Sequence, residues 1–226
     1  LADLAQGNAR KKRAALIDPA LRSLERTKME EGQRIKLLLI IKPVWHNYVY
    51  DTAKLNEVFD LEIQEDPVGV SGTEQTLAYG THVLVEQGCD YVTWMGDDAL
   101  FHPTWHLRLQ KLIRDKPHAK DWSVYRSAYE LFHQTLKEEG EYTMVSTLCG
   151  HGMTMSAQEW KDWGQDWTQG GILNGGLTMD LRHALEIPGE HWTTSVSYVE
   201  HTGREGVHCR PEYPEWAVAF QGTQDW

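Results

Sequence analysis

The sequence contains little cysteine and no long hydrophobic run. Its 226 residues include only three cysteines, Cys89, Cys149 and Cys209. Three thiols cannot all pair with one another, which favours a reducing compartment, and we expect a cytoplasmic protein. No apolar run approaches the ~20 residues of a membrane-spanning helix, and the first residues do not have the pattern of a signal peptide. We therefore expect a soluble protein without a membrane span.

Basic residues are also fewer than acidic ones. The 22 lysine and arginine residues are outnumbered by 33 aspartate and glutamate residues, which gives a net charge of −11 at pH 7. Because contact with nucleic acid phosphates needs a basic face, this balance argues against nucleic acid as a partner, although a local basic groove would still allow one. With 41% hydrophobic and 24% charged residues, the composition is that of a globular protein and excludes a wholly disordered chain.

The first 33 residues differ in pattern from those that follow. Residues 1–33 mix both signs of charge with apolar residues near helical spacing, which predicts a solvated helical extension at the N-terminus. An alternative is a helix that lies on a partner or membrane surface through the basic cluster at residues 11–13. The pattern then changes to apolar runs, and we place a single domain at residues 34–226.

Apolar runs and helical patterns alternate in the first half of this domain. Strands are expected at residues 34–43, 60–67 and 89–98, and helices at residues 47–59, 73–88 and 104–115. Strands that alternate with helices are joined by parallel crossovers, so the pattern predicts an α/β fold. The second half is less regular, with strand-like residues at 142–150 and 193–201 among loops rich in glycine and tryptophan.

Two adjacent carboxylates follow the third apolar strand. Asp97 and Asp98 come directly after the run 89–96, and ligands of open α/β sheets gather at the carboxyl ends of the strands. Two neighbouring carboxylates repel one another, which favours a cation between them. Oxygen ligands of this kind suit Mg²⁺ or Mn²⁺, which commonly bind substrate phosphates as well. The alternative is a turn in which these acids cap a helix or strand.

The sequence around this acidic pair resembles the donor-site segment of GT-A fold glycosyltransferases. Residues 77–109, LAYGTHVLVEQGCDYVTWMGDDALFHPTWHLRL, are similar to the helix and apolar strand that lead into the D-x-D motif of that family. The motif is here Gly96-Asp97-Asp98, so glycine stands where the first aspartate is expected. The resemblance implies that Asp98 binds the metal ion and that Asp97 takes over the ribose contact of the missing carboxylate.

Two later segments resemble the same family and follow in its order. Residues 150–160, GHGMTMSAQEW, are similar to the glycine-bearing segment between the donor and acceptor sites. Residues 195–208, SVSYVEHTGREGVH, are similar to the C-terminal H-x-G-x-x-G segment. The resemblance covers roughly residues 34–210 and implies that His201 completes the metal site. It also implies a GT-A (Rossmann-like) fold, with a mixed, mainly parallel sheet flanked by helices.

The general base is expected between these two segments. The family carries an acidic E-D-x-D-L segment there, and the nearest match is residues 175–181, GGLTMDL. Only Asp180 survives from that pattern, which makes it the candidate to take the proton of the acceptor hydroxyl. Asp180 as a helix cap is the alternative, and Glu159, Asp166 and Glu190 are the other candidates for the base.

Several further residues stand where a nucleotide-sugar is expected to bind. They are Lys42, Pro43 and Trp45 after the first strand, Asp66 after the second, Arg204, and the amides of Gly150, His151 and Gly152. The loop after the first strand of a nucleotide-binding sheet commonly holds the base, and the arginine fork suits a phosphate. The alternatives are surface charges at Lys42 and Arg204 and a turn at Asp66 before Pro67.

Together these features predict a metal-dependent glycosyltransferase. We expect it to use Mn²⁺ or Mg²⁺ and to move a sugar from a nucleoside diphosphate sugar, with UDP-sugar favoured, to a hydroxyl acceptor such as a glycan. Inversion is favoured over retention. The alternatives are a metal-dependent sugar-phosphate nucleotidyltransferase and an inactive GT-A-like carbohydrate-binding or scaffold module. A zinc site built from Cys149, His151, His208 and Cys209 is also open, although the paired ligands usual for zinc are missing.

Overall fold

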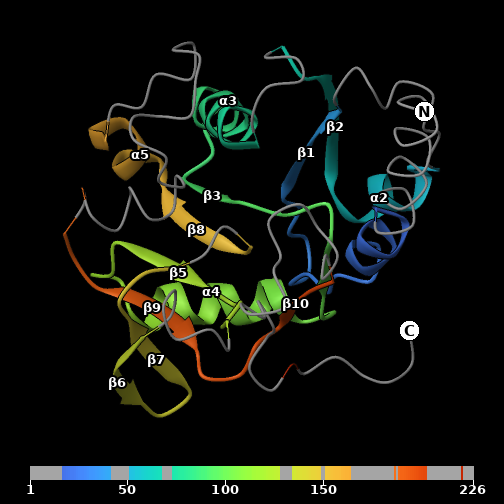
Figure 1. Ribbon diagram of the computed structural model, residues 1–226. Coiled ribbons are helices and arrows are strands. Elements are labelled where there is room, and N and C mark those ends of the chain that lie inside the picture. The colour runs from blue at the N-terminus through green and yellow to red at the C-terminus, as the bar shows by residue number, and fades with distance from the viewer. Residues whose placement is uncertain are drawn as a thin grey trace, which may run out of the picture.

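The computed structural model describes residues 17–41, 51–67, 73–127, 134–148, 151–163, 186, 188–202 and 220. Within them the chain is a mixed α/β fold (Figure 1). The helices are α2 (Ala53–Val58), α3 (Thr73–Glu86), α4 (Trp105–Asp115) and α5 (Ala157–Trp163), and residues 17–24 are also helical. The strands are β1 (Lys36–Ile41), β2 (Asp60–Glu65), β3 (Tyr91–Thr93), β4 (Ala99–Phe101), β5 (Asp121–Ser123), β6 (Thr135–Glu139), β7 (Tyr142–Val145), β8 (Met153–Ser156), β9 (His191–Thr194) and β10 (Val199–His201).

The largest sheet has six strands in the order β3-β8-β5-β9-β7-β6. Its only parallel pair is β5–β9, and the other four pairs are antiparallel. Two smaller sheets accompany it, a parallel pair β1–β2 and an antiparallel pair β4–β10. The α/β class is therefore confirmed, but the expected mainly parallel sheet is wrong for the described residues.

The difference has a local cause in the second half of the chain. Strand β6 is joined to β7 by the two-residue loop Gly140-Glu141, and a loop this short forces antiparallel pairing. Gly140 has a φ of 62°, which is the left-handed conformation that two-residue hairpin loops demand and that glycine adopts without strain. Strand β3 pairs with β8, more than fifty residues further along, instead of with the parallel pair β1–β2.

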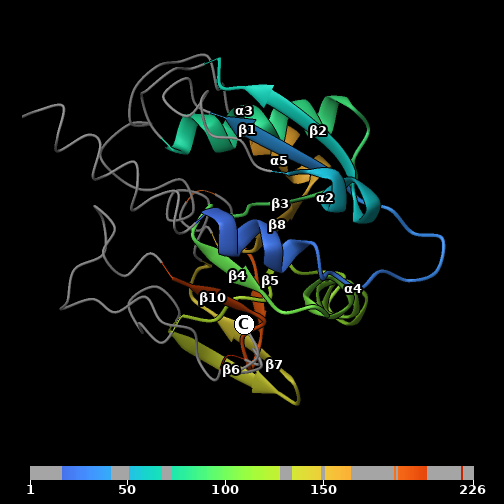
Figure 2. The same ribbon diagram turned by 90° about the vertical axis from the view of Figure 1, so that its right-hand side faces the viewer.

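The expected elements of the first half are present at nearly their expected positions. Strands β1 and β2 are parallel and in register from Lys36–Asp60 to Ile41–Glu65, as the helix between them requires. Helix α3 packs against β1 and β3, and α4 packs against β5 and β9. In Figures 1 and 2, α3 and α5 lie above β3 and β8, and α4 lies below them. The third strand, β3, is shorter than the apolar run that predicts it.

The described part of the N-terminal segment packs into the main hydrophobic core. Ala20, Ser23 and Leu24 are buried, and the Ser23 hydroxyl accepts a hydrogen bond of 3.0 Å from the amide of Phe101 in β4. The indole N–H of Trp105 donates to the Thr27 hydroxyl at 2.9 Å. A solvated extension is therefore wrong for residues 17–27, because this segment covers β4 and the start of α4.

A second cluster of buried side chains lies under α3 and α5. Trp94 donates its indole N–H to the Thr81 hydroxyl of α3 at 2.8 Å. Trp160 and Trp163 of α5 are buried in the same cluster and meet edge to face, with their ring centroids 5.9 Å apart. Aromatic pairs in this arrangement add to the stability that burial provides. These tryptophans are therefore core residues that fix α5 against β8.

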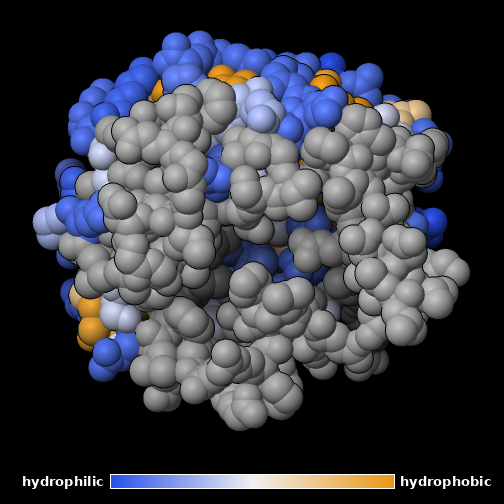
Figure 3. Space-filling view, turned by 45° about the horizontal axis from the view of Figure 1, so that its top comes forward, coloured by the Kyte–Doolittle hydropathy of each residue, from blue (hydrophilic) through white to orange (hydrophobic). Residues whose placement is uncertain are grey.

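The described surface is mostly polar. On the face in Figure 3, its hydrophobic residues form small separate spots among hydrophilic ones. The large hydrophobic residues that are exposed in the described ranges, Ile63, Tyr91 and Leu136, lie on three different strands. Among the same residues, no helix combines the length and the apolar character needed to cross a membrane.

We expect Ser23→Ala to lower the free energy of unfolding by about 1–3 kcal/mol, because the buried amide of Phe101 would lose its partner. Urea unfolding followed by tryptophan fluorescence measures this loss. A stability equal to that of the wild type would show that residues 17–27 are not part of the folded core.

Burial lowers the pKa of His106 below its ordinary value, and the charge of Glu30 opposes this only in part. The unfolded chain therefore takes up a proton at this histidine near pH 6.5, while the folded chain does not. Stability should fall as the pH drops below about 6.5, and His106→Leu should make that fall shallower. Thermal unfolding of both proteins between neutral and mildly acidic pH measures the difference, and parallel curves would contradict it.

Candidate metal centre

Three side chains from distant parts of the sequence converge at one point. Asp98, His151 and His201 each offer one ligand atom, and these atoms all lie within 4.8 Å of one another. Asp98 stands in the turn before β4, His151 two residues before β8, and His201 at the end of β10. Two of them, Asp98 and His201, are the metal ligands that the resemblance implies.

Pairing between β4 and β10 brings Asp98 and His201 together. In that antiparallel pair His201 lies opposite Ala99. The next residue, Thr202, donates both its amide (2.8 Å) and its hydroxyl (2.7 Å) to the carbonyl oxygen of Asp98. The backbone of the acidic turn is thus held to the strand that carries the histidine. Figure 2 shows β4 and β10 side by side.

Pairing between β3 and β8 brings His151 to the same turn. Beyond the last pair of that ladder, the amide of Trp94 donates to the carbonyl of Met153, and the amide of Gly152 donates to the carbonyl of Trp94, each at 2.8 Å. This continuation places His151 beside the residues that follow Trp94. Gly152 has a φ of 77°, a left-handed conformation that favours glycine and turns the chain from His151 into β8.

The three side chains are partly sheltered and contact one another. The Nε2 atom of His201 lies 3.3 Å from Oδ2 of Asp98. The rings of His151 and His201 are stacked, with centroids 4.2 Å apart and planes at 24°. The side chain of His201 is 5% exposed and that of Asp98 is 14% exposed. Solvent therefore reaches the centre mainly from the side of Asp98 and His151.

The donor chemistry of this cluster fits a divalent metal ion. One carboxylate and two imidazoles are common ligands of first-row transition metals. Two ligand atoms on opposite sides of an ion, with bonds of about 2.0–2.2 Å, lie up to about 4.4 Å apart. Ligand atoms already within 4.8 Å can therefore meet one ion through small side-chain movements.

The structure places the other predicted site residues in different surroundings. Asp97 is exposed beside the cluster. Asp66 is buried, accepts a hydrogen bond from the Thr76 hydroxyl at 2.9 Å and bonds through its amide to β1. The amide of Gly152 is used within the sheet by its bond to Trp94, so its expected contact with a donor sugar is wrong.

Four predicted site residues lie outside the described part of the chain. They are Lys42, Pro43, Arg204 and Asp180. Trp45, Gly150 and the alternative zinc ligands Cys149, His208 and Cys209 also lie outside it. The general base and the phosphate contacts therefore stay predictions.

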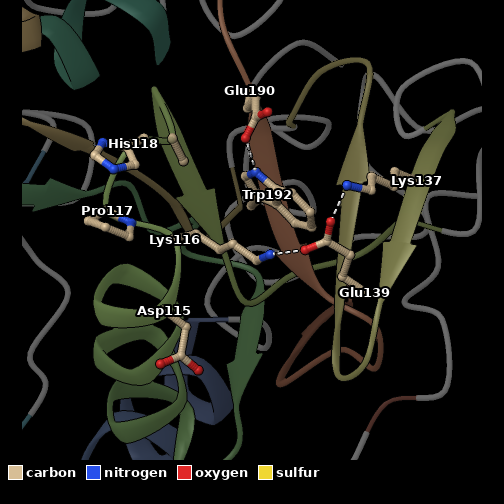
Figure 4. Close-up of a pocket in the computed structure, with 9 residues that line it drawn as sticks. Asp115, Lys116, Pro117, His118, Lys137, Glu139, Glu190 and Trp192 are labelled. Carbon is tan, nitrogen blue, oxygen red and sulfur yellow. Dashed lines mark hydrogen bonds and ion pairs between the residues drawn. The ribbon is translucent and has the colours of Figure 1, made fainter.

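A surface pocket elsewhere in the fold does not contain the cluster. It lies between the end of α4 and strands β6 and β9, and its lining includes Lys116, Lys137, Glu139 and Trp192 (Figure 4). Glu139 pairs with both lysines, which lowers its pKa to about 2, and Lys116 stacks on the Trp192 ring at 3.8 Å. These charges are therefore paired with one another within the pocket.

Sequence reasoning missed His151 as a partner of Asp98 and His201. It assigned this residue a backbone contact or a place in a zinc site. The signal that was available is its position directly before Gly152 and the apolar segment MTMS. This pattern predicts that a strand begins just after His151. It does not predict that the strand pairs with β3.

Comparison with known proteins does not identify a family for this chain. No family model matches the sequence, and no curated protein matches it. Among solved structures, the crystal structure of A197 from STIV is similar with a TM-score of 0.49 and 7% sequence identity, over 74% of this chain and 84% of that chain. A likeness at this level supports no conclusion about function.

Proposed function

We propose that this protein is a metal-dependent glycosyltransferase of the GT-A type. It would transfer a sugar from a nucleoside diphosphate sugar, with UDP-sugar favoured, to a hydroxyl group such as that of a glycan, with inversion favoured. The observation that carries the proposal is the meeting of Asp98 and His201. These residues are 103 positions apart, yet their side chains lie 3.3 Å from each other, and the resemblance to GT-A enzymes selects the same two residues as metal ligands.

The two side chains would hold Mn²⁺ or Mg²⁺ at the position of the donor phosphates. When bound, such an ion offsets the negative charge that develops on a departing diphosphate. Asp98 and His201 keep the ion in place, and Thr202 fixes the backbone of Asp98 through its two hydrogen bonds. The carbonyl of Asp98 is thus engaged with Thr202, while its carboxylate Oδ2 lies 3.3 Å from Nε2 of His201. Asp180 is proposed to accept the proton of the acceptor hydroxyl.

A second candidate is an inactive GT-A-like binding or scaffold module. It is favoured by Gly96, which stands where the D-x-D motif has its first aspartate, and by Leu177-Thr178, which stand where the acidic pair is expected. An inactive module can keep donor binding but does not release UDP. The nucleotidyltransferase alternative needs UTP and a sugar phosphate as substrates instead.

We expect the wild type with Mn²⁺ to release UDP from at least one member of a panel of UDP-sugars. Asp98→Ala and His201→Ala should each lower kcat/KM at least about a hundredfold, or ~2.7 kcal/mol of transition-state stabilisation. The matched control is Asp90→Ala, because Asp90 is an exposed aspartate just before β3, and its activity should equal that of the wild type.

The same assay separates the alternatives. Absence of UDP release with every sugar, together with no thermal shift by UDP and Mn²⁺, would reject the transferase and favour the scaffold. Release of pyrophosphate from UTP and a sugar phosphate, without release of UDP from the UDP-sugars, would favour the nucleotidyltransferase.

A further inference from the structure

We infer that His151 is a third ligand of this metal site and occupies the space beside Gly96 that the first aspartate of a D-x-D motif would need. The inference rests on the metal site of the proposed function and specifies its ligands and its ion. It makes the donor set one carboxylate and two imidazoles, from Asp98, His151 and His201. Such a set selects a first-row transition metal over Mg²⁺.

The space around Gly96 is the first argument. A Cβ atom built at Gly96 would lie 2.6 Å from Nδ1 of His151, 2.7 Å from its Cε1 and 2.9 Å from Oδ1 of Asp98. Contacts this short are repulsive for any side chain. An aspartate at position 96 would therefore force the imidazole of His151 out of its present position. Because glycine has no side chain, it leaves room for the histidine in the site. Its presence is therefore more than the loss of a ligand.

The supports of the His151 ring are the second argument. On one side the ring is stacked on His201, at 4.2 Å between centroids. On another it meets the buried ring of Tyr125 edge to face at 5.8 Å. The backbone of the next residue, Gly152, is held by its hydrogen bond to Trp94. The ring is thus oriented before any ion arrives, and preorganised ligands lose less freedom on binding.

The donor atoms are the third argument. Mg²⁺ and Ca²⁺ prefer oxygen ligands, and Mg²⁺ keeps several waters in octahedral geometry. Imidazole nitrogens suit Mn²⁺, Fe²⁺, Co²⁺, Ni²⁺ and Zn²⁺. Two histidines and one carboxylate on one side of an ion leave its other positions open, and these positions are the ones that phosphate oxygens of a donor would need. The structure thus favours a transition ion where carboxylates alone would accept Mg²⁺.

The first test is metal binding by the free protein, without nucleotide or sugar. Calorimetry with Co²⁺ and electron paramagnetic resonance with Mn²⁺ measure affinity, and Mg²⁺ is added as competitor. The wild type should bind both transition ions and keep them in excess Mg²⁺. His151→Ala should weaken binding at least about tenfold, since even the supporting residues of metal sites are worth roughly 10–100-fold. The control is His118→Ala, at an exposed histidine outside the cluster, with wild-type affinity expected.

The second test uses the exclusion between position 96 and His151. Gly96→Ala should weaken Co²⁺ binding about as much as His151→Ala, because the added methyl group displaces the ring. The double variant should bind no more weakly than His151→Ala alone, since the two changes remove the same ligand. Additive losses would show that Gly96→Ala acts through Asp98, whose Oδ1 lies 2.9 Å from the added Cβ, and would overturn the exclusion between position 96 and His151. Binding that is unchanged in either single variant would overturn the inference.

These outcomes are separate from those of the transferase assay. Binding of Co²⁺ that depends on His151, in a protein that releases no UDP from any UDP-sugar, would support the third ligand and reject the transferase. Release of UDP with Mn²⁺, in a protein whose metal affinity does not change in His151→Ala, would reject the third ligand and leave the transferase standing. A wild type that binds neither Co²⁺ nor Mn²⁺ overturns the inference outright.

Discussion

The hydrogen bonds between Thr202 and the Asp98 carbonyl join the two ends of the candidate site. They extend the pairing of β4 with β10, in which His201 lies opposite Ala99, by one residue into the acidic turn. The pairing is short, since β4 and β10 each have three residues. It is supported from the other side by residues 17–27, whose Ser23 hydroxyl accepts from the backbone of β4. Residues 17–27 therefore support the site indirectly, because they fix the strand that follows Asp98.

The close contact between Gly96 and His151 gives a physical reason for glycine at the first position of the D-x-D motif. Taken alone, the missing carboxylate at position 96 suggests that a contact of the site has been lost. In the fold, the same position lies against the imidazole of His151, which stands two residues before β8. In the proposed site, a second imidazole would shift the preference toward transition metal ions.

Local patterns predicted the elements better than their partners. The helices at 73–86 and 105–115 and the parallel pair β1–β2 agree with hydrophobic periodicity and with the length of the connection between the strands. The sheet of six strands does not follow from such patterns, because several of its strands have only three or four residues. A strand that short carries almost no periodic signal. Its neighbour is chosen by packing over long distances along the chain, as when β8 inserts between β3 and β5.

The sequence by itself determined the α/β class, the acidic turn at Asp97 and Asp98, and the pairing of Asp98 with His201 as candidate ligands. The first two depend on local composition and hydrophobic pattern, which a sequence displays directly, and the third depends on the resemblance to GT-A enzymes. Only the tertiary structure decided that the side chain of His151 lies beside these two residues, and that the Gly152 amide is hydrogen-bonded within the sheet. It also decided that residues 17–27 belong to the core. Each of these is a contact between segments far apart in the chain, and the register of strand pairing, which no single segment encodes, sets which atoms meet.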